Sequence, residues 1–482
     1  MSLETEIKKQ LENKTDIKLI RSNLMKRGYL EKDIDQSLNK LTSSSKSVFS
    51  KNKNNFLFSI KESMDRVAYG FGSQQFVNIL FLLSGGSLFF IGLINGIRAV
   101  LTNIFSGLLN SYTKLSEIKK NFISISGILY GFSFLGMAFS IMLMNPFLFA
   151  LFFILGVFGL TAHGDVYFNF YNSNIKLENR GFYLKFISYF GIIITGVSLF
   201  VAALIIELIP VSGTIINIFS TPLKIYGYLI VFEITALLFI ISGYLMSKID
   251  DKRDLLTEAS INYSLLIKNY FKESYEDSAI FRKDKKIYLL MIATVITTVV
   301  QIIGNTYYGI MIYYSFKEVF LGGFLNVAMI FLIALIASIS GSFLTKSFSK
   351  SLGEAPMLVF GTLLIALLPL TFYFNNNLYS ISIATALSVV GGTIVGVAQG
   401  LMAERLMDST ERKRYFSALG FVSLIPIIIF VFFASLFAQI YDLKLLFLVL
   451  GCILGFLVVP LYFIIVIAFD KEYHQIKNLT KK

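Results

Sequence analysis

Twelve separate runs of mostly apolar residues, each long enough to cross a lipid bilayer, constrain this chain more than any other feature of its sequence. A membrane-spanning helix needs roughly 20 consecutive apolar residues. Only 15% of the 482 residues are charged, against about 25% in average globular chains. A soluble chain with so few charges could not keep its surface hydrated, so the sequence predicts an all-α, multi-pass membrane protein.

The distribution of basic residues predicts how the chain is oriented in the membrane. All but five of the 43 Lys and Arg lie on one side of the predicted spans; the exceptions are Lys224, Lys317, Lys444, Arg66 and Arg98. Cytoplasmic loops carry the excess of Lys and Arg, so both termini are expected in the cytoplasm and the protein in the plasma membrane. The net charge of +13 then reflects the Lys and Arg of the cytoplasmic loops, which set the orientation in the membrane. No nucleic-acid partner is expected.

The runs fall into two groups of six, separated by a polar stretch near mid-chain. The expected spans are residues 64–84, 87–110, 120–143, 146–170, 184–209, 222–247, 286–315, 320–345, 354–374, 378–404, 413–438 and 444–468. The expected domains are a cytoplasmic helical bundle (1–45), a tether (46–62), a six-helix half (63–247), a linker with an amphipathic helix (248–285), a second six-helix half (286–470) and a cytoplasmic tail (471–482).

Several kinds of chemistry are not expected. Cys452 is the only cysteine, and His163 and His474 are the only histidines, which argues against a disulfide or a metal centre. The chain has no Gly-rich phosphate-binding loop of the ATPase type. No nucleophile and base share a plausible pocket, so neither an enzyme nor a cofactor is expected.

The layout resembles the major facilitator superfamily from about residue 62 onwards. The stretches from Gly107 to Lys114 and from Gly341 to Lys346 resemble the turns that follow the second and eighth helices of that family, with Ser111 and Thr345 where the family has Asp. The loops from Glu178 to Gly181 and from Thr410 to Arg414 resemble each other and the family at equivalent places in both halves. The resemblance implies two halves around a central cavity lined by the first, fourth, seventh and tenth helices.

This resemblance implies a secondary transporter that moves a small polar or anionic solute by alternating access, with proton coupling as an option. The Gly-Pro pair of drug antiporters is absent from Phe190 to Gly196, whereas the stretch from Gln301 to Tyr308 is similar to part of the sugar porters. Two alternatives stay open. One is a lipid or lysolipid flippase of the same fold, and the other is a membrane sensor or scaffold that acts through residues 1–45.

Polar side chains inside the predicted spans are candidates for substrate contact, because each needs a partner or water in the bilayer. Gln301, Asn305 and Tyr308 fall on one helical face, and Gln74 and Asn78 share a face of the first span. Gln399 lies in the tenth. Gly392, Gly396 and Gly400 repeat every four residues there, which favours close helix packing.

Arg98 lies near the middle of the second span and could bind an anionic substrate group, since guanidinium offers a fork of donors to carboxylate or phosphate. A structural ion pair is the alternative. Glu233 lies at nearly the same depth and is therefore the expected static partner of Arg98.

Asp165 is the candidate for gating or proton coupling. His163, two residues away, could change the proton affinity of its carboxyl group. The favoured interpretation is a gate in which Asp165 pairs with Arg180 or Arg412, in loops near the inner end of the fourth span.

The stretch from Leu24 to Leu38 is similar to ubiquitin-associated-like helical bundles, a pattern that also precedes membrane segments in some archaeal proteins. It suggests a cytoplasmic protein partner for residues 1–45, although a solvated bundle without a partner fits equally well. The remaining expected partners are the small-molecule solute and the lipid bilayer, and the chain is expected to be a monomer.

Overall fold

The structure is a computed structural model that describes residues 24, 53–115, 120–167, 170–171, 177–209, 212–218, 221–249, 263–351, 353–375 and 377–468. The chain divides into two units, Met1–Ser59 and Ile60–Lys482. The predicted bundle and tail lie outside the described residues, apart from Leu24.

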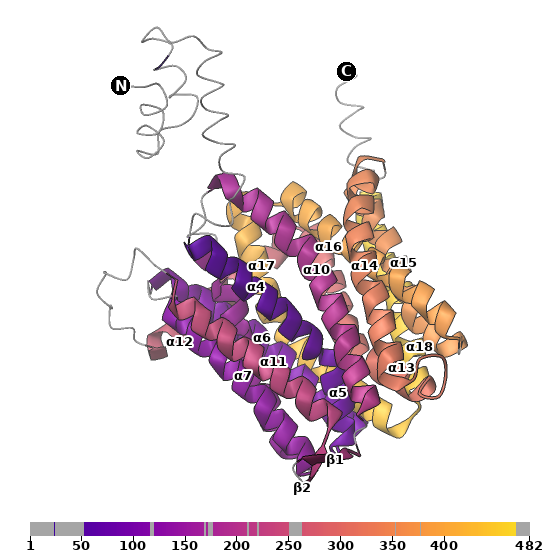
Figure 1. Cartoon of the computed structure of the whole chain (residues 1–482). Coiled ribbons are helices and arrows are strands. Elements are labelled where there is room, and N and C mark those ends of the chain that lie inside the picture. Colours follow the sequence, from indigo (N-terminus) through magenta and orange to yellow (C-terminus); the bar gives the residue numbers. More distant parts are fainter. Residues whose placement is uncertain are drawn as a thin grey trace, which may run out of the picture. The chain divides into compact units, whose positions relative to one another are not determined.

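Helices account for nearly all of the described chain (Figure 1). The first half contains α4 (Lys53–Phe71), α5 (Gln74–Leu83), α6 (Leu88–Leu115), α7 (Lys120–Met142), α8 (Pro146–Thr161) with the π-helical turn η2 (Ala162–Val166), α10 (Leu177–Leu208) and α11 (Gly227–Ser247). The linker contains α12 (Tyr263–Asp277) and the 3-10 turn η3 (Ser278–Arg282). The second half contains α13 (Lys285–Ser315), α14 (Gly323–Ser351), α15 (Glu354–Phe374), α16 (Leu378–Leu406), α17 (Ser409–Ile440) and α18 (Leu443–Cys452), which continues as the π-helical turn η4 (Ile453–Val458).

Eleven helices among the described residues are long and apolar enough to cross a membrane. The first predicted span, 64–84, is the exception, because it is broken into α4 and α5 at Gly72 and Ser73. Phe134 and Thr235 approach Gly72 so closely that a side chain there would meet their atoms at 2.7 Å. The glycine therefore lets the chain bend where two other helices press on it.

A two-stranded antiparallel hairpin was missed by the sequence analysis. Strands β1 (Thr214–Ile218) and β2 (Thr221–Ile225) pair with Thr214 opposite Ile225, and helix α11 begins only at Gly227 rather than at residue 222. The β-branched residues of this segment suit a strand, but β1 had been left between two predicted spans and most of β2 had been included in the span 222–247. We call this side of the unit the hairpin end and the opposite side, where α6 ends and α7 begins, the linker end.

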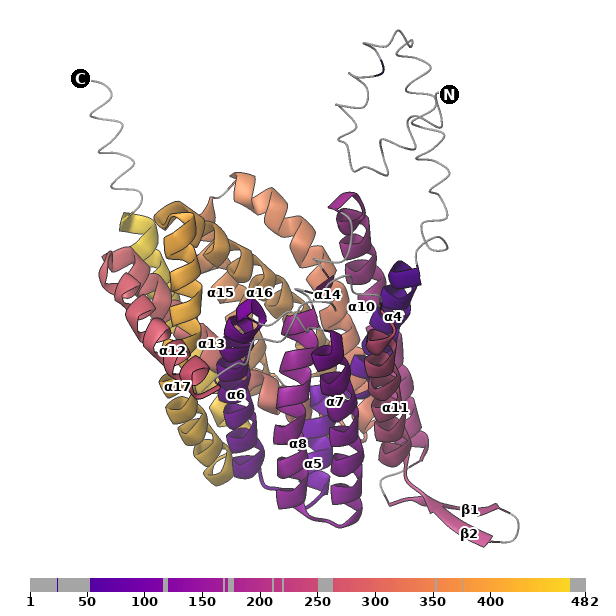
Figure 2. The same ribbon diagram turned by 90° about the vertical axis from the view of Figure 1, so that its left-hand side faces the viewer.

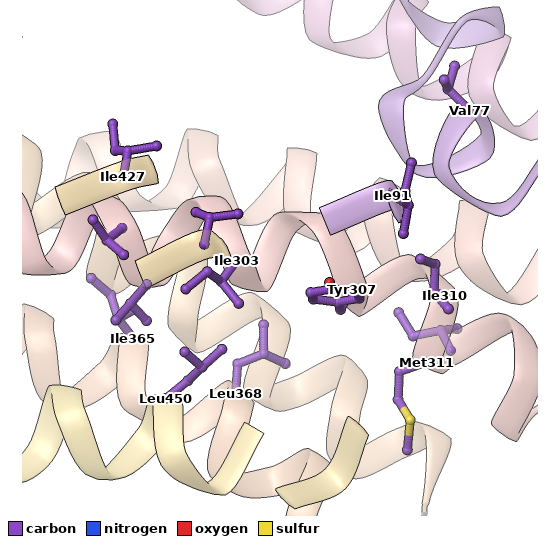
Figure 3. Packing of buried hydrophobic residues seen from close by; sticks show 14 of the residues in the cluster. Val77, Ile91, Ile303, Tyr307, Ile310, Met311, Ile365, Leu368, Ile427 and Leu450 are labelled. Carbon is purple, nitrogen blue, oxygen red and sulfur yellow. The ribbon is translucent and has the colours of Figure 1, made fainter. Parts of the chain in front are cut away.

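The two halves meet where α6 packs on α17 and α13, α10 on α14, and α5 on α13. Figure 2 shows α6 beside α17 and α10 beside α14. Helix α13 runs through the buried core, where Ile303 and Tyr307 lie among side chains of other helices and Ile91 of α6 approaches from the other half (Figure 3). This packing surrounds the polar residues described next with rigid walls.

Candidate functional site

Two polar cavities lie in corresponding places in the two halves. The first, of about 150 Å³, is lined by residues of α4, α5, α6, α7 and α8. The second, of about 450 Å³, is lined by residues of α13, α14, α15 and α16. The helices around the first cavity are the first four spans of one half, and those around the second are the first four of the other. The two cavities are therefore lined by helices at equivalent places in the order of each half.

Arg98 supplies the positive charge of the first cavity, which it lines together with Gln74, Tyr130 and Ser133. Its guanidinium carbon lies 5.1 Å from the centre of the Phe153 ring, a cation–π contact. Among the described side chains, no carboxylate lies within 4.0 Å of the guanidinium.

The expected pairing of Arg98 with Glu233 is wrong. Glu233 is exposed on the outer face of α11, and it does not line the cavity that contains Arg98. Two side chains at equal depth in the membrane can still lie on different faces of their helices. Here the face of α11 that carries Glu233 points away from Arg98.

The amides of the first half form a chain that reaches the second half. Gln74 donates to Asn95 at 2.8 Å, and Asn95 donates to Asn78 at 3.1 Å. Asn78, which is fully buried, donates to the Thr306 carbonyl of α13 at 3.1 Å. Gln74 thus lines the first cavity, whereas Asn78 ties α5 to α13 and lines neither cavity.

The predicted polar stripe of α13 lines the second cavity. Gln301, Asn305 and Tyr308 all border it, together with Ser388 and Thr393 of α16. Gln301 and Asn305 are exposed towards this space. The lining combines amide and hydroxyl groups with no charged side chain, so it can hydrogen-bond a neutral polar group.

Aromatic rings fix the position of Tyr308. Its ring stacks on Phe372 of α15 at 5.4 Å and on Phe447 of α18 at 5.3 Å, with interplanar angles of 12° and 22°. Stacking of this kind holds the ring rigidly at the cavity wall.

The remaining predicted site residues lie elsewhere. Gln399 donates to the Tyr462 hydroxyl at 2.9 Å and borders neither cavity. Arg412 pairs with Glu404 at 2.9 Å, at the turn between α16 and α17. The side chains of Asp165 and Arg180 lie outside those the structure describes, so the predicted gate between Asp165 and Arg180 or Arg412 stays a prediction.

His163 lies in a buried charged cluster that the sequence analysis missed. Its Nε2 atom lies 2.9 Å from Oδ2 of Asp65, and Lys61 Nζ lies 2.6 Å from the same oxygen. Ser242 of α11 donates to the other carboxylate oxygen at 2.5 Å. Lys61 had been assigned to the polar tether. Its spacing of four residues from Asp65, however, is typical of an ion pair on one helical face and could have been recognised in the sequence.

The glycine stripe of α16 does not pack against another helix, so that prediction is wrong. A methyl group at Gly392, Gly396 or Gly400 would meet no described atom within 4 Å, and the same holds at Gly164 in η2. Gly392 borders the second cavity, and the other two share its helical face. The stripe therefore widens the space beside the cavity towards the linker end.

The hairpin end, in contrast, is closed by contacts between the halves. The Phe89 amide of α6 donates to the Gln439 side chain of α17 at 3.2 Å, and Tyr307 donates to the Leu88 carbonyl at 2.9 Å. The Phe324 amide of α14 donates to Glu207 of α10 at 3.2 Å. Polar groups from both halves are thus bonded across this end.

Neither a known family profile nor a curated sequence matches the chain, but solved structures do. It is similar to the nucleoside transporter NupG (TM-score 0.64, 13% identity, 87% of this chain and 99% of that one). It is also similar to a bacterial homologue of the human lysosomal transporter Spinster in an inward-facing, unoccupied conformation (0.59, 14%, 88% and 98%). A third is a bacterial homologue of the iron transporter ferroportin in an inward-facing state (0.58, 13%, 85% and 98%).

These likenesses show that the chain has a fold of the major facilitator type. The eleven apolar helices place it among multi-pass membrane proteins. The low sequence identity limits the comparison to the fold, so the chemistry has to be argued from the cavities.

Proposed function

We propose that this protein is a secondary transporter that moves a small organic anion by alternating access between the two halves. The fold supports this, and so does the contrast between a hairpin end closed by hydrogen bonds across the halves and open space beside α16. Each half contains one of the two cavities, and in alternating access the two halves move against each other to expose a site to each side in turn.

The observation that carries the anionic substrate is Arg98, which lines a polar cavity with no described acid beside it. Arg98 is half-buried. A cation partly withdrawn from water without a counter-ion is costly, and a bound anion would relieve that cost through charge-assisted hydrogen bonds. The volume of about 150 Å³ suits a carboxylate or phosphate group with a few waters rather than a whole solute. The neutral lining of the second cavity suits the uncharged part of the substrate.

Matched pairs of solutes that differ by one anionic group, such as an amide and its acid, test this proposal by thermal-shift binding to the purified protein. We expect the acid alone to raise the unfolding temperature, because a ligand that binds only the folded state stabilises it. Arg98→Gln should weaken binding about tenfold or more, with Arg98→Lys intermediate. Uptake into proteoliposomes should follow the same order.

Glu233→Gln is the matched control, since it also removes one charge from a spanning helix but lies outside both cavities. It should leave binding and uptake unchanged. The anion site is refuted if Arg98→Gln leaves both binding and protein abundance at the level of the unmodified chain.

A lipid-like substrate is the second candidate, favoured by a third cavity of about 280 Å³ between α13, α17, α18 and η4. Its lining is entirely apolar, from Val295 and Phe430 to Leu457, and could hold an acyl chain while Arg98 holds a headgroup. Proteoliposomes containing a labelled lysolipid distinguish the two, because only a flippase changes the leaflet in which the label resides.

A further inference from the structure

The buried cluster around Asp65 joins three separate parts of the first half. Lys61 and Asp65 come from α4, His163 from η2 and Ser242 from α11, and each of these side chains is nearly inaccessible. Neither cavity is lined by any of the four. Ionisable groups in a membrane interior are costly unless they pair or act in function, and the proposed anion site does not use these.

Both ring nitrogens of His163 face hydrogen-bond acceptors. Nε2 faces the Asp65 carboxylate at 2.9 Å, and Nδ1 faces the Ile123 carbonyl of α7 at 3.4 Å. A neutral imidazole carries a proton on only one nitrogen, so it can satisfy only one of these acceptors. The doubly protonated, cationic ring satisfies both.

The proton on His163 sets the net charge of the cluster. Lys61 and Asp65 together are neutral, so a charged His163 leaves the cluster with one extra positive charge. Glu62 of α4 is the next acid and lies 3.8 Å from Arg66. Loss of the His163 proton therefore changes both the net charge and the hydrogen bonds.

Few other titratable groups approach the cluster. Tyr167 of the α8 segment places its ring under the Lys61 ammonium at 3.1 Å and beside His163, and Tyr69 and Tyr130 are the phenols of α4 and α7 in its electrostatic range. Arg98 of α6 lines the first cavity instead, and Glu233 of α11 points outwards. The side chains of Lys114 and Asp165 lie outside those the structure describes.

The local backbone lets the His163 ring lie close against α7. Gly127 of α7 makes space for the ring, since a side chain there would meet Nδ1 at 2.9 Å. At Gly164, the next residue of η2, a side chain would meet no described atom within 4 Å. Single-turn π-helices are frequent at functional sites, and this one carries the histidine that bridges α4 and α7.

We propose that this cluster is a proton-binding site, in which the exchangeable proton sits on Nδ1 of His163 and ties η2 to α7 while Nε2 holds it to α4. Loss of that proton removes the bond to the Ile123 carbonyl and so weakens the tie between η2 and α7. The proton then serves as the coupling ion, a role that rests on the proposed transport function, whereas proton binding itself does not.

The scarcity of histidine makes the site directly measurable. In the full chain with His474→Gln, ring-labelled histidine reports only His163 by nuclear magnetic resonance in lipid nanodiscs. We expect two protonated ring nitrogens at about pH 5.5 and a neutral ring protonated on Nε2 at about pH 9. A ring that stays neutral on the same nitrogen across this range would overturn the proposal.

A second measurement tests whether protonation of His163 changes the contact between the two halves at the hairpin end. Phe89→Cys and Gln439→Cys, in a Cys452→Ala background, place a cysteine pair across the closed hairpin end, whose cross-linking yield should depend on pH. His163→Gln should abolish this dependence, and His474→Gln should retain it. An unchanged pH dependence in His163→Gln contradicts the proposal.

Failure of transport is a separate outcome. If no solute crosses proteoliposomes but His163 gains and loses its proton as expected, the transport proposal fails and the proton site stands. If uptake proceeds while His163 stays neutral, only the proton site fails.

Discussion

Glycines in this fold differ sharply in how much room surrounds them, although the sequence alone cannot tell them apart. At Gly92 of α6, a side chain would lie 2.0 Å from the Ser435 hydroxyl and 2.1 Å from the Tyr307 hydroxyl, so the glycine permits the contact between α6, α13 and α17. At Gly396 of α16, a side chain would meet no described atom. The four-residue repeat of glycines in α16 had predicted close packing at Gly396, where the structure has none among the described atoms.

Gly92→Ala should therefore destabilise the protein by about 1–3 kcal/mol, as overpacking in a filled core does. Gly396→Ala, the matched control, should be neutral or slightly stabilising, because alanine favours helix by up to about 1 kcal/mol. Thermal unfolding of the purified variants in detergent measures both. Equal unfolding temperatures for the two variants would refute the close approach at Gly92.

The polar residues illustrate what could be predicted at this scale. Helical spacing placed Gln301, Asn305 and Tyr308 on one face, and the structure shows that face lining a cavity. Spacing could not show that Asn78 would bond the backbone of α13 or that His163 would contact Asp65. Those contacts join residues 228 and 98 positions apart in the chain, and only tertiary packing decides them.

The helices show why element ends are predictable where side chains cap them. The span predicted to start at residue 146 does so in the structure, where Asn145 caps α8 by accepting from the Phe147 and Leu148 amides. Asp408 and Glu411 form a capping box at the start of α17. By contrast, the hairpin and the break at Gly72 have no capping signal, and both were missed.

The cap of α17 gives a pH-dependent prediction. The bond from the Glu411 backbone amide, joined by that from Thr410, holds the pKa of Asp408 below its ordinary value of 3.8. The charged form is thus favoured in the folded state. Its contribution to stability is present above the unfolded pKa and is lost as the pH falls through the folded pKa.

Asp408→Asn keeps an amide oxygen for capping but removes the charge. It should lower the unfolding temperature at neutral pH, and the difference from the unmodified chain should shrink as the pH falls below about 3.8. Unfolding curves at several pH values measure this. A difference that is independent of pH would mean that the charge of Asp408 does not stabilise α17.

For the molecule as a whole, the all-α membrane fold was predictable, because runs of apolar residues long enough to span a membrane follow one another along the chain. Twelve spans were expected, and eleven helices among the described residues meet the length and hydropathy required. The orientation in the membrane remains a proposal. It places the hairpin outside the cell and α12 in the cytoplasm, because nearly all basic residues lie on the linker side.

Single cysteines in a Cys452→Ala background test this orientation. Ile215→Cys in β1 and Tyr275→Cys in α12 both occupy exposed positions. We expect an impermeant maleimide to label Ile215→Cys in intact cells and Tyr275→Cys only after permeabilisation. The reverse pattern would invert the topology and, with it, the side to which the space beside α16 opens.

The break between α4 and α5 has an electrostatic consequence for the first cavity. The first turn of a helix has backbone amides without intrahelical acceptors and carries a partial positive charge. Helix α5 begins at Gln74, the Ser73 side chain does not cap it, and both Gly72 and Gln74 border the cavity that contains Arg98. The helix dipole and the guanidinium thus act on the same space, so its electric field favours an anion more strongly than the formal charge of one arginine suggests.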